Sequence, residues 1–177
     1  RRVAVPWGGV PALRSGADVL VHGVMSQPID DEFIQLARLR SVIYTPTLTV
    51  GDGYRQVRSR HFEPRYPLHC VDPVTLAHAH ATDTIPGSTA NVVDRRLQTG
   101  IANLTLVARA GITIAMGTDA GNPLTLHGPS VLWEMESMQE AGMSPMEVLV
   151  ASTRNGARAM GREREFGTLE AGKMADL

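Results

Sequence analysis

Short apolar runs alternate with longer amphipathic stretches along this chain of 177 residues. The runs at 18–22, 42–45 and 112–116 are rich in β-branched residues, which is typical of buried β-strands. A further short strand is expected at Val3–Val5. Pro46 follows the second run and cannot donate a ladder hydrogen bond, so strand pairing should stop there. The pattern therefore predicts three strands, or four with the one at the start.

Helical spacing of apolar positions fills the segments between and after these runs. Residues 51–87 have a looser pattern, rich in Arg, His and Pro, and indicate a long insertion with some helix. One helix is expected after Pro28, with Phe33, Leu36, Ala37 and Leu39 on one face, and another starts at Asp72-Pro73. A third is expected around 97–108, before Gly111, and a fourth at 130–141, with Leu132, Met135 and Met138 facing inward. The last starts at the capping box of Ser144 and runs to about Met160, before Gly161.

The order of these elements predicts an α/β fold. Strands separated by helices pair in parallel through right-handed crossovers. Three or four such units do not close an eight-unit barrel, which needs about 250 residues. We therefore expect the C-terminal part of a larger (β/α)8 TIM-like barrel, and an open doubly wound sheet is the structural alternative.

Composition excludes several classes of function. The net charge is −1, with 17 basic and 18 acidic residues, which gives no reason to expect nucleic acid as a partner. No apolar run approaches the ~18 residues of a membrane span. Cys70 is the single cysteine, so no internal disulfide can form. The chain starts at Arg1 without a methionine and resembles the middle of a gene product, so we leave the compartment open, with the cytoplasm favoured.

Two polar groups follow apolar runs at corresponding places. Asp119 follows the run at 112–116, and His22 ends the run at 18–22. The carboxyl ends of parallel barrel strands open onto one face, so these distant residues could share one ion, and imidazole and carboxylate both suit zinc. The alternatives are an aspartate that caps the following loop and a histidine with a structural hydrogen bond.

The remaining histidines divide into two groups. His78 and His80 are spaced as on one face of a strand, but the helix expected from Asp72 makes them a solvated helix surface. His61 and His69 in the same polar segment are interpreted in the same way. His127 lies on the loop after Asp119 and could bind substrate, or could be an exposed loop residue. Gly167–Lys173 lacks the hydroxyl of a phosphate-binding loop and indicates a turn.

Several segments together resemble a known family, the metal-dependent amidohydrolases, in its imidazolonepropionase-like and prolidase-like branch. The closing third of that family is similar to Gly111–Gly121, Glu140–Pro145, Ala151–Gly161 and Phe166–Leu177. Its sixth and seventh strands are similar to Ala17–Gly23 and Thr45–Thr49.

The resemblance implies a (β/α)8 barrel with a small β-sandwich. Residues 1–166 would be the C-terminal portion of the barrel, about strands five to eight, and 167–177 the start of the return to the sandwich. His22 and Asp119 would be metal ligands from strands six and eight, for one or two divalent ions, zinc above all. Pro6-Trp7 stands where a strand-five histidine is expected, so either a ligand has been lost or residues are omitted.

The function implied is hydrolysis of an amide or cyclic C–N bond, with Asp119 as general base. The substrate would be a small amide or a dipeptide-like molecule, bound near His127, Tyr44 and Thr47. A homo-oligomer is compatible with this reading. The alternatives are an incomplete or degenerate barrel fragment that binds or packs without catalysis, and a lyase or isomerase on the same kind of metal barrel.

Overall fold

A four-stranded parallel sheet lies at the centre of the computed structural model, which describes residues 3–4, 9–66, 68–81 and 90–175. Its spatial order, β1-β2-β3-β4, follows the chain, and the register places Leu20 beside Tyr44 and Tyr44 beside Ile114. Parallel pairing and the α/β class are as predicted. Among the described strands the order never reverses, as it would in a doubly wound sheet. The strands are β1 (Val3–Ala4), β2 (Val19–Val21), β3 (Ile43–Thr45) and β4 (Thr113–Ile114).

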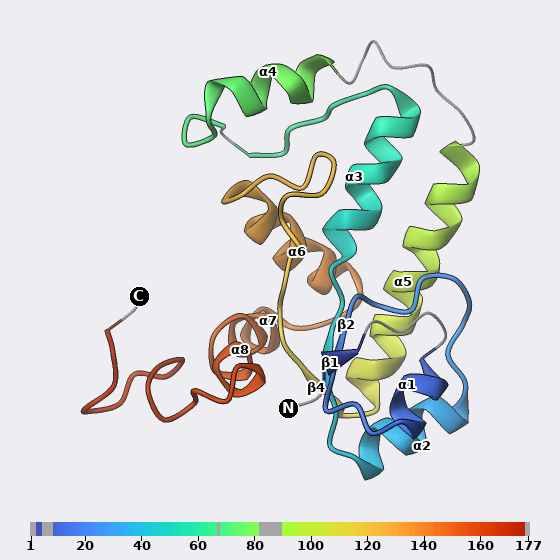
Figure 1. Cartoon of the computed structure of the whole chain (residues 1–177), viewed down its shortest axis with the longest axis vertical. Coiled ribbons are helices and arrows are strands. Elements are labelled where there is room, and N and C mark those ends of the chain that lie inside the picture. The colour runs from blue at the N-terminus through green and yellow to red at the C-terminus, as the bar shows by residue number, and fades with distance from the viewer. Residues whose placement is uncertain (1–2, 5–8, 67, 82–89, 176–177) are drawn as a thin grey trace.

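Helices join and follow these strands (Figure 1). The long helices α3 and α5 run side by side, and α4 lies at the end of α3 that is remote from the sheet. Helices α1 and α2 pack together at the opposite end of the molecule. The bounds are α1 (Val10–Arg14), α2 (Asp31–Leu39), α3 (Leu48–Ser59), α4 (Pro73–Ala81), α5 (Ala90–Arg109), α6 (Pro129–Glu140), α7 (Pro145–Ser152) and α8 (Arg154–Ala159).

Several helix ends are fixed by the caps that the sequence predicts. The Asp72 carboxylate accepts a hydrogen bond of 2.8 Å from the Thr75 N–H at the start of α4. Ser144 and Glu147 form the complete capping box of α7. Gly111 has a φ of 69°, the left-handed conformation that ends a helix after α5.

Side chains on the two faces of the sheet enter different cores. Leu20, Tyr44 and Ile114 belong to the large cluster that also contains buried residues of α2, α5 and α6. Their neighbours Val19 and Ile43 are buried in a smaller cluster on the other face. Apolar burial on both faces is typical of a parallel sheet.

Three helical segments differ from the prediction. Residues 48–59 form the regular helix α3, which begins before Gly51, where a long insertion with some helix was expected to start. On α6, Leu132 was expected to face inward but is 45% exposed, whereas Trp133 and Met138 are buried. The helix expected from Ser144 to about Met160 is broken at Thr153, where φ and ψ are −120° and −86°.

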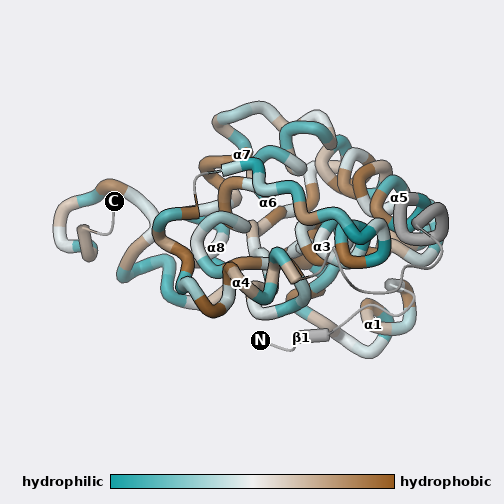
Figure 2. Tube along the Cα trace, turned by 90° about the horizontal axis from the view of Figure 1, so that it is seen from above, coloured by the Kyte–Doolittle hydropathy of each residue, from teal (hydrophilic) through white to brown (hydrophobic). Residues whose placement is uncertain are grey.

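The chain after α8 contains no helix or strand over the described residues 160–175. It extends away from the body of the molecule and combines hydrophilic and hydrophobic positions (Figure 2). A return to a β-sandwich at 167–177 therefore stays a prediction, and Pro6-Trp7, where a strand-five histidine was expected, lies outside the described residues.

Candidate metal and substrate site

Three side chains follow the carboxyl ends of neighbouring strands. His22 comes directly after β2, Thr47 comes two residues after β3, and Asp119 follows the run that contains β4. All three backbones are left-handed, with φ values of 69°, 49° and 53°. Residues other than glycine rarely adopt this conformation, and a β-branched threonine least of all. We call these three residues the strand-end site.

The imidazole of His22 is the point at which these side chains meet. Its Nδ1 lies 3.0 Å from the Thr47 hydroxyl and 3.7 Å from Oδ2 of Asp119. The His22 and Asp119 side chains are 35% and 41% exposed, so solvent reaches both. Residues almost a hundred positions apart are therefore brought together at one edge of the sheet.

Asn122 fixes the carboxylate of Asp119. Its side-chain amide donates 2.7 Å to Oδ2 of Asp119 and 2.9 Å to the Asp119 carbonyl oxygen. The sequence analysis did not single out Asn122. The available signal was an amide three residues after an aspartate, a spacing that favours side-chain to backbone bonds in a turn.

The loop that presents His22 is tied to β3 and to the residue after it. The Gly23 N–H donates 2.8 Å to the Pro46 carbonyl, and the Val24 N–H donates 3.0 Å to the Tyr44 hydroxyl. A β-carbon at Gly23 would lie 2.9 Å from that hydroxyl, so only glycine fits without a shift.

Tyr44 has a different place from the one predicted for it. The prediction put its side chain at the substrate, but it is 1% exposed and packs edge-on against the Phe33 ring in the main core. Burial raises the pKa of its hydroxyl. The physical reason is strand alternation, because Tyr44 points to the helix-covered face of the sheet. Its observed role is to hold the backbone beside His22.

Thr47 and His127 differ in how far they are exposed. Thr47 is 3% exposed, and its hydroxyl is directed at His22. His127 is exposed on the loop after Asp119, and its Nε2 would lie 3.9 Å from a β-carbon at Gly121. His127 therefore lies beside Gly121, which follows Asp119 by two residues, and it is open to solvent.

Glu134 of α6 is a buried carboxylate that the sequence analysis did not identify. It accepts 2.9 Å from the Leu48 N–H and 2.8 Å from the Thr49 N–H, at the first turn of α3. Burial raises the pKa of Glu134 from 4.5 to about 7, against the opposing effect of these hydrogen bonds. The signal in the sequence was weak, because an acid on a helix usually faces water.

The other histidines are as predicted. His78 and His80 are exposed on α4, where His80 stands edge-on against the Phe62 ring at 5.3 Å between centroids. His61 and His69 are exposed as well. Over the described part of the chain, no three His, Cys, Asp or Glu side chains are grouped so that they could hold a metal ion.

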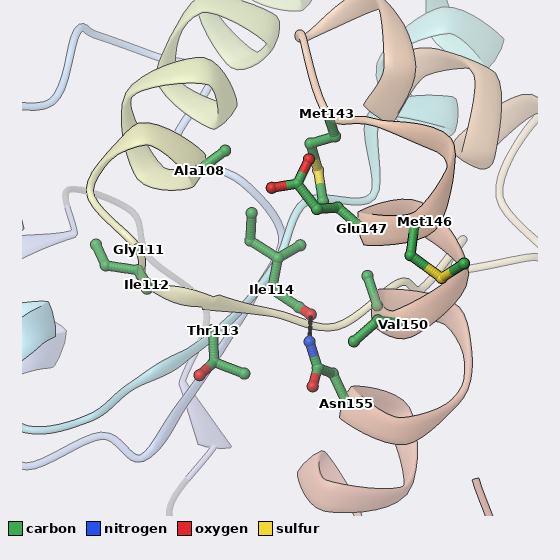
Figure 3. A pocket seen from close by; sticks show the side chains of 11 residues that line it. Ala108, Gly111, Ile112, Thr113, Ile114, Met143, Met146, Glu147, Val150 and Asn155 are labelled. Carbon is green, nitrogen blue, oxygen red and sulfur yellow. Dashed lines mark hydrogen bonds between the residues drawn. The ribbon is translucent and has the colours of Figure 1, made fainter. Parts of the chain in front are cut away.

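A cavity of about 240 Å³ lies elsewhere, between α5, α7 and the amino end of β4 (Figure 3). Its lining is mostly apolar, and the Asn155 amide donates 2.8 Å across it to the Ile114 carbonyl. No residue of the strand-end site lines it. We place the candidate chemistry at the carboxyl ends of the strands, where the ionisable groups converge, and not in this cavity.

None of the helices in the described segments has the length and apolar character needed to cross a bilayer.

Sequence comparison connects the chain with hydrolytic enzymes. The profile of the Amidohydrolase family matches residues 49–177. The chain is 42% identical over 82 residues to an imidazolonepropionase of Shouchella clausii, covering 46% of this chain and 18% of that protein. It is 37% identical over 89 residues to a 5-methylthioadenosine/S-adenosylhomocysteine deaminase of Moorella thermoacetica, covering 46% and 21%. The chain thus matches about a fifth of the length of these curated relatives.

Structural comparison gives related proteins over almost the whole chain. A putative prolidase from Bifidobacterium longum superposes with a TM-score of 0.67 at 27% identity, covering 98% of this chain and 39% of that one. A Xaa-Pro dipeptidase with bound methionine in its active site gives a TM-score of 0.65 at 22% identity, covering 93% and 34%, and shares the fold. The family profile covers more than half of the chain, including the segment that carries Asp119, and on this evidence the chain belongs to the Amidohydrolase family.

Proposed function

We propose that this protein is a metal-dependent hydrolase acting on an amide or cyclic C–N bond. The observation that carries the proposal is the approach of His22 Nδ1 to Asp119 Oδ2 at 3.7 Å, at the carboxyl ends of parallel strands. Membership of the Amidohydrolase family supports it. The names of the relatives, an imidazolonepropionase, a deaminase and a putative prolidase, support small amide or dipeptide-like substrates.

The two donors fit a divalent ion, with zinc as our proposal. Imidazole and carboxylate are both zinc ligands, and both side chains are open to solvent. A bound divalent ion would supply Lewis acidity, polarising a carbonyl and lowering the pKa of water.

Asp119 is the proposed general base. Its carboxylate takes the proton of the water whose oxygen attacks the carbonyl carbon. It then gives that proton to the nitrogen as the C–N bond breaks, so no net proton is consumed by the protein. The Asn122 amide holds Oδ2 in place during both transfers. Nδ1 of His22 lies 3.7 Å from the same oxygen atom.

The substrate would lie against the loop that carries His127. That imidazole is exposed beside Gly121 and can donate to or accept from a substrate group. Thr47 would act on the substrate through His22 and not by direct contact, because its hydroxyl already lies 3.0 Å from the His22 imidazole. We further propose that residues 1–166, with β1 to β4, are the C-terminal portion of a (β/α)8 barrel, which the unreversed strand order supports.

The first test replaces Asp119 by Asn. We expect turnover to fall by about 10²- to 10⁴-fold, because the amide cannot accept the proton. Turnover is measured on N-acyl amino acids, Xaa-Pro dipeptides and cyclic amides, with analysis of the released amine and acid. Asp31→Asn, an exposed position on α2, is the matched control and should keep full activity. Near-normal turnover in Asp119→Asn would refute the assigned role.

Elemental analysis of the purified protein separates this proposal from a degenerate, non-catalytic fragment. About one or two equivalents of zinc, reduced in His22→Ala, support the enzyme. Full occupancy in that variant, or no bound metal together with no turnover, contradicts it. The fragment reading draws on the incomplete donor set of the described residues.

A further inference from the structure

We propose that Glu134 is a positioning residue of the strand-end site, holding His22 and Asp119 in register through the first turn of α3. The inference rests on the function proposed above. Glu134 touches neither residue, and it acts through Thr47 and Thr49.

Helix α3 starts without the usual cap. The first N–H groups of a helix have no partner inside the helix, and the side chain before it normally accepts from them. Thr47 occupies that position, with a left-handed φ of 49°, and its side chain makes no capping bond. The Glu134 carboxylate takes over the task, accepting from the Leu48 and Thr49 N–H groups at 2.9 and 2.8 Å. An anion at this end also suits the helix dipole.

Because Glu134 caps the helix, the Thr47 hydroxyl is available for another partner. It lies 3.0 Å from Nδ1 of His22 instead of bonding to its own helix. The second threonine extends the same arrangement in the other direction, because the Thr49 hydroxyl donates 3.2 Å to the carbonyl oxygen of Thr118, directly before Asp119. One carboxylate therefore connects, through two adjacent hydrogen bonds, to both sides of the strand-end site.

Burial makes this carboxylate costly for packing alone. Glu134 is fully buried, with an accessibility of 0%. A buried carboxylate is stabilising only when its hydrogen-bonding geometry is very good, and apolar residues of similar volume are often as good or better for stability. An apolar side chain cannot accept hydrogen bonds from the Leu48 and Thr49 N–H groups, and so it cannot fix the backbone that directs Thr47 and Thr49. The geometry thus favours positioning over stability as the role of Glu134.

The test compares Glu134→Gln with Met138→Ala in the metal-loaded protein. Met138 lies one turn further along α6 and is fully buried, so its truncation destabilises the same helix and leaves the Glu134 carboxylate unchanged. Gln keeps the size of Glu but presents an N–H₂ group to one of the two N–H donors. We expect Glu134→Gln to weaken zinc binding about 10- to 100-fold, as for other residues that orient metal ligands. It should also lower kcat more than it changes KM.

A second readout does not depend on metal or turnover. In the metal-free protein, ¹⁵N NMR of the His22 imidazole reports its hydrogen-bond environment. The ring signals should move in Glu134→Gln and stay in Met138→Ala. If both variants lose thermal stability while zinc affinity, kcat and the His22 signals are unchanged, Glu134 is only structural and the inference is overturned.

Two further outcomes keep this result separate from the proposed function. If wild type binds no zinc but the His22 signals still move in Glu134→Gln, the hydrolase proposal fails and the connection from Glu134 to His22 stands. Should Glu134→Gln fail to fold, Thr49→Val removes the hydroxyl that bonds to the Thr118 carbonyl and that also faces the Glu134 carboxylate, and it keeps the Thr49 N–H bond to Glu134. That variant must weaken zinc binding as well, and unchanged affinity contradicts the inference.

Discussion

The Tyr44 hydroxyl supports the backbone next to His22 from inside the core. It accepts from the Val24 N–H at 3.0 Å, and Tyr44 is 1% exposed. Water cannot replace a lost acceptor at such a depth, so the N–H would remain unpaired. Removal of the Tyr44 hydroxyl from the core would therefore affect the backbone beside His22, whose side chain solvent can reach.

We expect Tyr44→Phe to lower the free energy of unfolding by about 1–3 kcal/mol, the cost of leaving a buried donor without a partner. Urea denaturation measures this change. The matched control is Tyr54→Phe on α3, where the tyrosine is 39% exposed and the change should stay within about 0.5 kcal/mol. Equal effects in the two variants would show that the bond to Val24 contributes nothing.

At the scale of single residues, the sequence allowed two members of the strand-end site to be predicted. His22 and Asp119 each follow an apolar run, and parallel pairing brings such ends together. The place of Tyr44 could not be predicted, because alternation along a strand shows that neighbours face opposite ways but not which face is covered. Glu134 was hidden for another reason, since its partners are backbone N–H groups 85 and 86 positions away.

Among the elements, α3 contains two glycines with opposite requirements. A β-carbon at Gly53 would overlap the Pro123 carbonyl oxygen, on the loop between Asp119 and His127. A β-carbon at Gly51 would make ordinary contacts of 3.4 Å with Leu97 and Met25. The first glycine allows a helix and a loop to approach closely, whereas the second has no such role.

This difference gives a paired prediction. Gly53→Ala should destabilise the protein by at least about 1–3 kcal/mol, because neither backbone can yield without displacing the loop. Gly51→Ala should be neutral or stabilise by up to about 1 kcal/mol, as alanine is the better helix former. Thermal unfolding of both variants checks this. Stabilisation in both would mean that the loop does not rest on α3.

The capping box of α7 is a second prediction about one element. Ser144 and Glu147 satisfy each other's backbone groups, and the bonds from Ser144 hold the pKa of Glu147 below its ordinary value. Ser144→Ala should cost about 1 kcal/mol of stability. Ser152→Ala at the other end of α7 should cost less, because Ser152 only bonds back to the Val148 carbonyl. Chemical denaturation compares the two, and equal costs would contradict a special role for the box.

Helix existence was predictable wherever caps are local, as at Asp72 and Ser144. The start of α3 was not predicted, because its two glycines weaken the helical pattern and its cap comes from another helix. On α6, Met138 and Met135 face the main core as predicted, whereas Leu132 is exposed. Glu134 and Ser137 are buried on the inward side as well, and polar positions give no apolar pattern to predict that from.

For the whole molecule, the sequence predicted the α/β class, the parallel sheet and the order of its elements, because apolar runs and helical spacing are local properties. How α3, α6 and the loop after Asp119 meet above the sheet depends on contacts between distant residues, such as those of Glu134. Such contacts leave no periodic trace in the chain.

Buried ionisable groups also shape how global stability responds to pH. Glu134 has a pKa of about 7 in the folded protein and 4.5 as its ordinary value. The folded state binds the proton of the Glu134 carboxyl group more tightly than the unfolded chain does. The stability that this proton contributes is therefore fully present below about pH 4.5 and is lost as the pH rises through about 7.

Melting temperatures between pH 5 and 8 test this effect as the difference between wild type and Glu134→Gln. As the pH rises from 5 to about 7, the melting temperature of wild type should fall relative to that of Glu134→Gln, and above about 7 the difference should stay constant. A difference that is constant across this range would show that Glu134 stays ionised when folded.

The left-handed backbones at His22, Thr47 and Asp119 have a practical consequence. Glycine relaxes such a conformation, whereas other residues pay for it in stability. Laboratory evolution that rewards heat resistance alone would thus drift toward glycine at positions 22, 47 and 119 and remove all three side chains of the strand-end site. Thermostabilised libraries of this protein should keep those three codons fixed.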